Sequence, residues 1–230
     1  MADRQGRAYD LDVLRQVLTL SFTKQMSRDS FSPQATLCVI GDGFASLTAL
    51  LLASGSAGRV VLVNLTKTLL VDLWYLRLWM GAYEFEGAVN LVTDAEGLHQ
   101  VLAAGEDSNG WRSVVAIQAE HHALLRHCPI GMAFNVVSMQ EMDPPVIAGY
   151  FDDLRAIAGK RPTLFYCCNR EEKMLPDGTV TRFANYPWWP GDQILIDELC
   201  PWHQHYYAAR PPFYRPYDGP IRHRLVRLSV

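Results

Sequence analysis

Short apolar runs alternate with amphipathic segments over most of the chain. The apolar runs have the length and composition of buried strands, and the segments between them carry apolar residues at helical spacing. This alternation is typical of a mostly parallel sheet that helices cover on both faces. We predict strands over residues 37–40, 60–63, 88–92, 113–117, 132–137 and 163–168, and helices over 9–22, 44–53, 67–80, 95–104, 119–126 and 141–157.

Two helix starts carry recognisable signals. Thr66 precedes the segment 67–80 and is predicted to cap that helix. Pro144 and Pro145 fall in the first turn of the helix predicted over 141–157, where a missing backbone N–H is tolerated.

The last third of the chain has a different pattern. Residues 173–198 alternate around Asp177-Gly178, a hairpin turn signal, and residues 222–228 suit a final strand. We therefore predict an α/β domain over 31–230 with an antiparallel C-terminal edge hairpin, preceded by an N-terminal helical extension over 1–30.

Composition and charge argue against nucleic acid and membranes as binding partners. Hydrophobic residues make up 49% and charged residues 20%, and the net charge of −3 gives no electrostatic basis for binding nucleic acid or an anionic membrane. No apolar run reaches the roughly 18 residues that span a bilayer, and the N-terminus lacks the apolar core of a signal peptide. We expect a cytoplasmic protein.

The cysteines and histidines give no recognisable metal or disulfide pattern. The five cysteines are odd in number and irregularly spaced, which favours free thiols in a reducing compartment. His121 and His122 follow Glu120, but no second cluster offers partner ligands at zinc spacing. We therefore predict no metal site.

The segment 37–52, LCVIGDGFASLTALLL, predicts a strand, a glycine turn and a helix. Gly41 and Gly43 allow backbone N–H groups to approach a nucleotide at the carboxyl edge of the sheet. S-adenosylmethionine, flavin and nicotinamide cofactors all use this device. Asn64 stands where a dinucleotide site usually has an acid, which makes a flavin or nicotinamide oxidoreductase the weaker interpretation.

The β-rich end after five strand–helix units resembles the class I S-adenosylmethionine-dependent methyltransferase fold. The blocks VIGDGFASLTALLL, NVVSMQEM, ILIDELCPWHQHYY and PPFYRPYDGPIRHRLVRL are similar to the sugar O-methyltransferase group within it. This resemblance implies a Rossmann-like fold, S-adenosylmethionine as cofactor, and methyl transfer to an oxygen of a small polar acceptor such as a sugar or glycan precursor.

The resemblance also implies the cofactor-binding residues. The glycine turn would hold the methionine part, the end of the second strand the ribose, the end of the third the adenine, and the end of the fourth would face the transfer centre. In that order the residues are Gly41, Asp42, Gly43 and Phe44; Asn64; Gln118 and Ala119; Ser138 and Met139.

Two residues are candidates for removing the acceptor proton. His203 lies in the aromatic segment CPWHQHYY, and histidine is the usual side chain for this task; its alternative role is a structural hydrogen bond. Glu141 follows the fourth strand, and its alternative role is a favourable charge in the first turn of a helix.

Two groups of residues are candidates for contacting the acceptor. Asn169 and Arg170 follow the strand 163–168 and could bind hydroxyls or phosphate, or form a solvated loop. Trp202, Tyr206 and Tyr207 offer flat walls for a sugar ring, or a contact in a homodimer.

Two other functions stay open. One is an N- or O-methyltransferase of a non-sugar natural product, because this fold serves many acceptors. The other is a non-catalytic, cofactor-binding partner subunit, since Val39, Ala45 and Asn64 depart from the usual acids and glycine of the family.

Overall fold

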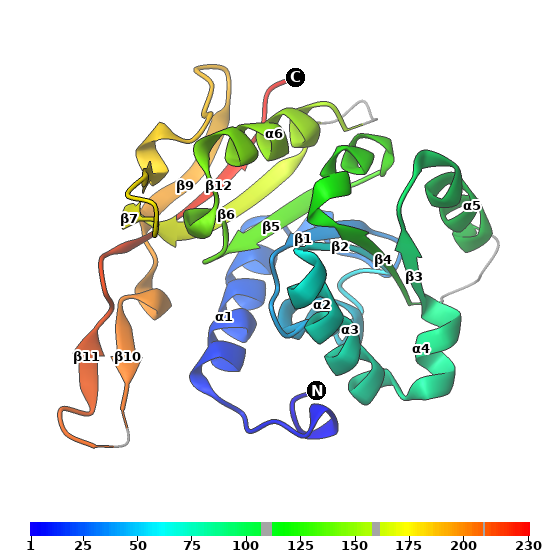
Figure 1. Ribbon diagram of the computed structural model, residues 1–230, viewed down its shortest axis with the longest axis horizontal. Coiled ribbons are helices and arrows are strands. Elements are labelled where there is room, and N and C mark those ends of the chain that lie inside the picture. Colours follow the sequence, from blue (N-terminus) through cyan, green and yellow to red (C-terminus); the bar gives the residue numbers. More distant parts are fainter. Residues whose placement is uncertain (107–111, 158–161, 209) are drawn as a thin grey trace.

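The computed structural model describes residues 1–106, 112–157, 162–208 and 210–230 and has an eight-stranded sheet at its centre (Figure 1). The strand order is β3-β4-β2-β1-β5-β6-β12-β9. The first six strands in this order are parallel, and β12 is antiparallel to both of its neighbours. The strands are β1 (Thr36–Ile40), β2 (Arg59–Asn64), β3 (Val89–Val92), β4 (Ser113–Gln118), β5 (Met132–Val136), β6 (Leu164–Arg170), β9 (Gln193–Leu199) and β12 (Ile221–Arg227). The predicted mostly parallel sheet with antiparallel strands at its C-terminal end is confirmed.

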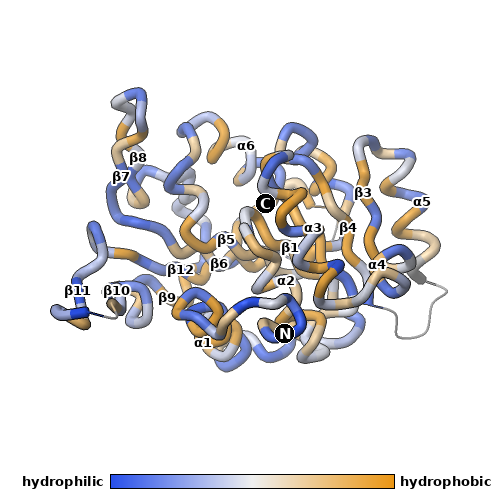
Figure 2. The backbone as a smooth tube through the Cα atoms, turned by 60° about the horizontal axis from the view of Figure 1, so that its bottom comes forward, coloured by the Kyte–Doolittle hydropathy of each residue, from blue (hydrophilic) through white to orange (hydrophobic). Residues whose placement is uncertain are grey.

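Both faces of the sheet are buried by helices. In β1, Leu37 and Val39 belong to one apolar cluster, and Cys38 and Ile40 belong to the other, as strand alternation requires. Figure 2 shows the central strands and α2 in the apolar colours. The first cluster lies under α1 (Leu11–Met26), α2 (Ser46–Ala53), α3 (Thr66–Met80) and α4 (Ala82–Ala88); the second lies under α5 (Ala95–Glu106), the 3₁₀ segment η3 (Ala119–His127) and α6 (Pro144–Arg155).

Helix α1 packs on the same core as the sheet. Its N-cap is Asp10, whose carboxylate accepts a 2.9 Å hydrogen bond from the backbone N–H of Val13. Leu20 is buried in the first cluster, and the ring of Phe22 lies 5.4 Å from that of Trp202. The segment predicted as an extension thus supplies core contacts, and this places α1 beside the C-terminal third of the chain (Figure 1).

Two predicted helix starts need correction. Leu65, not Thr66, is the N-cap residue of α3, and the Thr66 hydroxyl instead accepts a 3.0 Å hydrogen bond from Gln118 Nε2. The helix predicted over 141–157 is divided into a 3₁₀ turn, η4 (Met139–Glu141), and α6, which begins at Pro144 because proline fits only the first helical turn.

The C-terminal third contains two hairpins outside the main sheet. The predicted turn at Gly178, with φ of +90°, joins β7 (Glu172–Met174) to β8 (Val180–Arg182). A second hairpin, β10 (His205–Tyr207) with β11 (Tyr214–Pro216), projects from the body of the molecule (Figure 1). The remaining 3₁₀ turns are η1 (Asp3–Gln5), η2 (Arg28–Ser30), η5 (Phe183–Asn185) and η6 (Pro201–His203). None of the helices in the described ranges has the length and apolar character needed to cross a membrane.

Candidate functional site

Two cavities adjoin at the glycine turn. The first, of about 420 Å³, lies at the carboxyl ends of β1, β2, β4 and β5; we call it the strand-end cavity. The second, of about 300 Å³, lies between the glycine turn, α1 and η6; we call it the α1 cavity. Gly41, Gly43 and Val137 line both cavities and therefore form a shared wall.

The two glycines of this wall are constrained in different ways. Gly41 and Gly43 both have positive φ, +76° and +84°. A Cβ on Gly41 would lie 2.2 Å from Ser138 Oγ, whereas nothing lies within 4 Å of a Cβ on Gly43. Gly41 therefore permits close packing of the end of β1 against the residue after β5, and Gly43 leaves open space where a ligand can approach the backbone.

Two carboxylates, the half-buried Asp42 and the fully buried Asp72, hold the glycine turn in place. Asp42 accepts hydrogen bonds from the backbone N–H groups of Leu47 (3.0 Å) and Thr48 (2.7 Å), at the start of α2. Asp72 on α3 accepts a 2.8 Å hydrogen bond from the N–H of Ala45, whose φ is +50°. Burial, and then the nearby Asp42 carboxylate, raise the pKa of Asp72 to about 7.

Asn64 belongs to the same network. Its Nδ2 donates a 2.8 Å hydrogen bond to Asp72, and its Oδ1 accepts one of 2.9 Å from the N–H of Leu65. The residue that sequence reasoning assigned to ribose lines the strand-end cavity, but its amide is already bonded within the protein.

A second network fixes the end of β5. Asn135 Nδ2 and Ser138 Oγ each donate a 3.0 Å hydrogen bond to the carbonyl of Ile40. Asn169 Nδ2 donates a 2.8 Å hydrogen bond to Asn135 Oδ1. Val137, between these groups, has a φ of +60°, a strained value for a β-branched residue. This strain lies in the wall that the two cavities share.

The nine predicted cofactor residues fall into three places. Those that line the strand-end cavity are Gly41, Gly43, Asn64, Ala119 and Ser138. Those that line the α1 cavity are Gly41, Asp42, Gly43 and Phe44. Two others point elsewhere: Gln118 Nε2 donates to Thr66, and the Met139 side chain is fully buried in the second core cluster.

The two candidate bases lie in different cavities. Glu141 lines the strand-end cavity; its side chain is half-exposed and lies 3.5 Å from Lys173 Nζ. His203 lines the α1 cavity and is only 3% exposed. Burial, followed by the charges of Arg15 and His223, lowers the pKa of His203 to about 3, which makes its ring neutral and weakly basic near pH 7.

The predicted acceptor residues lie outside these two cavities. Trp202, Tyr206 and Tyr207 line a third cavity of about 380 Å³ between α1 and the β10–β11 hairpin. Asn169 is fully buried in the network at the end of β5. Arg170 forms a 3.0 Å ion pair with the exposed Asp218.

Sequence reasoning named no site residue in α1 or in the segment before it. Arg7, Asp12, Arg15 and Gln16 all line the α1 cavity. Arg15 is nearly buried and donates to the carbonyls of Trp202 (3.1 Å) and His205 (2.7 Å). The sequence does place polar residues at positions 12, 15 and 16 on one face of a helix. It does not show which part of the molecule that face contacts.

Comparisons with known proteins show the fold. No protein-family model matches the chain, and a search of curated proteins finds no relative. The methyltransferase domain of bacterial CtHen1 is 11% identical, with a TM-score of 0.51 over 95% of this chain and 100% of that one. A protein solved in work on the conversion of a disulfide bond into a thioacetal group during echinomycin biosynthesis is also 11% identical, with a TM-score of 0.50 over 89% of this chain and 80% of that one. The chain therefore has a Rossmann-like α/β fold similar to that of the CtHen1 domain.

Proposed function

We propose that the protein is an S-adenosylmethionine-dependent methyltransferase that acts on an oxygen of a small polar acceptor, with sugars and glycan precursors as the first class to test. The observation that carries this proposal is the pair of cavities that share Gly41, Gly43 and Val137. Methyl transfer needs a donor and an acceptor held about 3 Å apart, and two cavities that adjoin at the same three residues suit two ligands placed side by side.

The strand-end cavity fits a nucleoside cofactor. Its volume lies in the range of ligand pockets, and it combines apolar walls with a few polar groups. The backbone at Gly43 and Ala119 would hold the cofactor there. S-adenosylmethionine, when bound, supplies a methyl group already activated on a sulfonium. The remaining work of the protein is to position the acceptor and take up its proton.

The α1 cavity fits a hydroxyl-bearing acceptor. Arg7, Asp12 and Arg15 give it both signs of charge. Gln16 Oε1 is buried and has no hydrogen-bond partner in the part of the chain that the structure describes. An acceptor hydroxyl that donates to this oxygen would supply the missing partner.

Glu141 and His203 remain the proposed groups for taking up the acceptor proton. The low pKa of His203 makes it a weak base, and general-base efficiency falls as the pKa moves away from the working pH. Glu141→Gln and His203→Asn distinguish the two, because only the variant of the true base should lower kcat while leaving cofactor affinity unchanged.

The test is transfer of isotope-labelled methyl from S-adenosylmethionine to a panel of free sugars, sugar phosphates and nucleotide sugars. Gln16→Ala should raise KM for an accepted sugar about tenfold, which corresponds to one lost hydrogen bond of roughly 1.4 kcal/mol. The matched control is Gln100→Ala on the exposed face of α5, which should change neither constant.

Other results would redirect the proposal. Label found on nitrogen would correct the acceptor atom. Label found only on non-sugar metabolites would correct the acceptor class. Tight S-adenosylhomocysteine binding without turnover on the whole panel would favour the non-catalytic partner subunit.

A further inference from the structure

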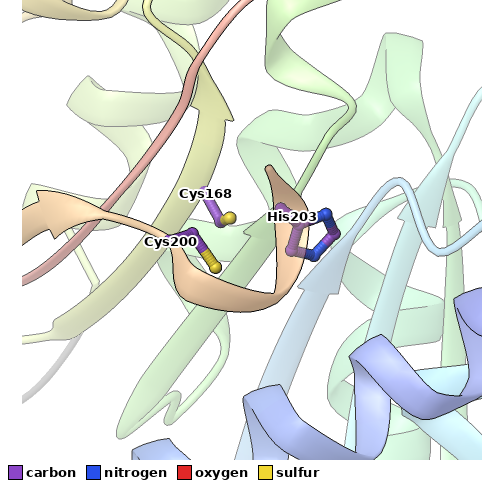
Figure 3. A group of neighbouring side chains, drawn as sticks. All are labelled: Cys168, Cys200 and His203. Atoms are coloured by element: carbon purple, nitrogen blue, oxygen red, sulfur yellow. The ribbon is translucent and has the colours of Figure 1, made fainter. Parts of the chain in front are cut away.

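Two thiols and an imidazole meet beside the α1 cavity. Cys168 lies in β6, Cys200 follows β9 directly, and His203 is in η6. All three are buried, and their potential ligand atoms lie within 4.8 Å of one another. In Figure 3 the two thiol side chains point into the same space, with the ring of His203 beside it.

His203 lacks the hydrogen bonds that a buried imidazole requires. Neither Nδ1 nor Nε2 has a partner among the residues that the structure describes, although the side chain is almost fully enclosed. A neutral imidazole carries one donor and one acceptor, and leaving such groups buried and unpaired costs about 1–3 kcal/mol each. A metal ion bound to one ring nitrogen would supply a partner that the polypeptide does not.

A second buried histidine lies next to the two cysteines but faces other groups. His223 in β12 pairs with Cys168 in the strand register and is fully buried. Its Nδ1 lies 3.0 Å from the hydroxyl of Tyr166, and its Nε2 lies 3.5 Å from Glu198 Oε1. The group of potential ligand atoms that lie within 4.8 Å of one another therefore consists of Cys168, Cys200 and His203.

We propose that Cys168, Cys200 and His203 bind a zinc-type divalent cation, with the fourth position left to a water molecule. Two thiolates and one imidazole are a known three-residue zinc set, and soft sulfur ligands disfavour magnesium and calcium. Zinc bonds of about 2.3 Å to sulfur and about 2.0–2.1 Å to nitrogen place ligand atoms roughly 3.5–4 Å apart, so small side-chain rotations would close the set.

Metal binding requires a route by which the ion reaches the cluster and the release of the thiol protons. His203 lines the α1 cavity, which gives an ion access to the cluster. Each cysteine thiol releases its proton to solvent as its sulfur bonds the metal, and His203 binds as a neutral ring. A metal-bound His203 carries its proton on the other nitrogen and cannot accept one, so Glu141 is then the group that takes up the acceptor proton. The ion would tie β6, the end of β9 and η6 together, which would also hold the His203 side of the α1 cavity in place.

The experiment uses the full chain, purified under reducing conditions and stripped of metal. Zinc binding is measured by competition with a chromogenic chelator, and cobalt(II) is titrated in parallel for the absorption bands of thiolate–cobalt bonds. We expect one ion per chain and a cobalt spectrum with thiolate charge transfer. The unmodified protein gives this spectrum, so the test does not depend on a variant that folds.

Variants then assign the ligands. Cys168→Ser and His203→Asn should weaken zinc binding by more than about 100-fold, because ligand loss exceeds the 10–100-fold effect of outer groups. Cys167→Ser is the matched control: Cys167 is the adjacent, equally buried residue, but it belongs to the opposite core cluster. It should change zinc affinity less than about threefold.

Three results would overturn the proposal. They are a cobalt spectrum without thiolate bands, equal losses in Cys167→Ser and Cys168→Ser, and a Cys168–Cys200 disulfide that excludes metal. All these readouts are independent of methyl transfer, so failure of the proposed activity would leave the metal site standing, and the reverse also holds.

Discussion

The two cavities that meet at the glycine turn are assembled in different ways. The strand-end cavity takes most of its walls from residues at or just after the ends of β1, β2, β4 and β5. The α1 cavity joins α1 to residues near the C-terminus, and Arg15 bonds carbonyls 187 and 190 positions away. The residues of the strand-end cavity can be predicted from the sequence, because parallel strands place their carboxyl ends at one edge of the sheet. The residues of the α1 cavity cannot be predicted in this way, because long-range packing brings them together.

The largest expected effect comes from adding one methyl group to the shared wall. Gly41→Ala should lower the free energy of unfolding by about 4 kcal/mol, because the new Cβ meets Ser138 Oγ and the backbone φ is positive. Cofactor affinity should fall more than about 100-fold. Urea unfolding and calorimetry measure the two effects.

Gly43→Ala is the control for this substitution. It carries the same backbone strain but meets no neighbouring atom, so it should cost only about 1 kcal/mol of stability. Equal losses of stability in the two variants would contradict the assignment of Gly41 to close packing.

The second largest effect is a pH dependence of stability that originates on the strand-end side alone. Asp72, behind the strand-end cavity, has its pKa raised from 3.8 to about 7, so the folded chain holds a proton that the unfolded chain has released. The contribution of Asp72 to stability is therefore fully present at low pH and is lost as pH rises from about 4 to 7. Asp72→Asn should remove roughly 3 kcal/mol of that loss. Urea unfolding at pH 5 and pH 8 provides the measurement, and parallel pH profiles of the variant and the unmodified protein would contradict this account.

The smallest of these effects should be confined to the α1 side. Arg15→Met leaves the carbonyls of Trp202 and His205 without their donor, which should cost about 2 kcal/mol. Acceptor kcat/KM should fall about 10–100-fold, with S-adenosylhomocysteine affinity changed less than about twofold. Arg77→Met, on the exposed side of α3, is the matched control. Equal losses of cofactor and acceptor binding would show that the two cavities are not separable.

The fold was predictable because its signals are local. The strand, glycine turn and helix of residues 37–52 lie where the apolar pattern places them, and the turn at Asp177-Gly178 forms its hairpin. The glycine requirement at Gly41 was predicted for ligand approach. Its packing against Ser138 was not, because Ile40 and Ser138 are bonded across 98 positions.

The acceptor side was only partly predictable. Trp202, Tyr206 and Tyr207 do form a wall, but it faces α1 in the third cavity. Asn169, predicted as an exposed polar contact, is buried under the end of β5. The proposed metal ligands follow no zinc spacing, since they are brought together by the pairing of β6 with β12 and by the turn after β9. A search for sequence motifs does not detect a group of ligands that lie so far apart in the chain.

The most direct test of the central claim is a comparison of S-adenosylhomocysteine, FAD and NAD as ligands of the purified protein by thermal unfolding. A ligand at about 100 times its dissociation constant stabilises the fold by roughly 2.7 kcal/mol, a rise of about 5–10 °C for a chain of this size. The account predicts this rise with S-adenosylhomocysteine alone and its loss in Gly41→Ala. A rise with FAD or NAD and none with S-adenosylhomocysteine would contradict the assignment of the strand-end cavity and, with it, the proposed methyl transfer.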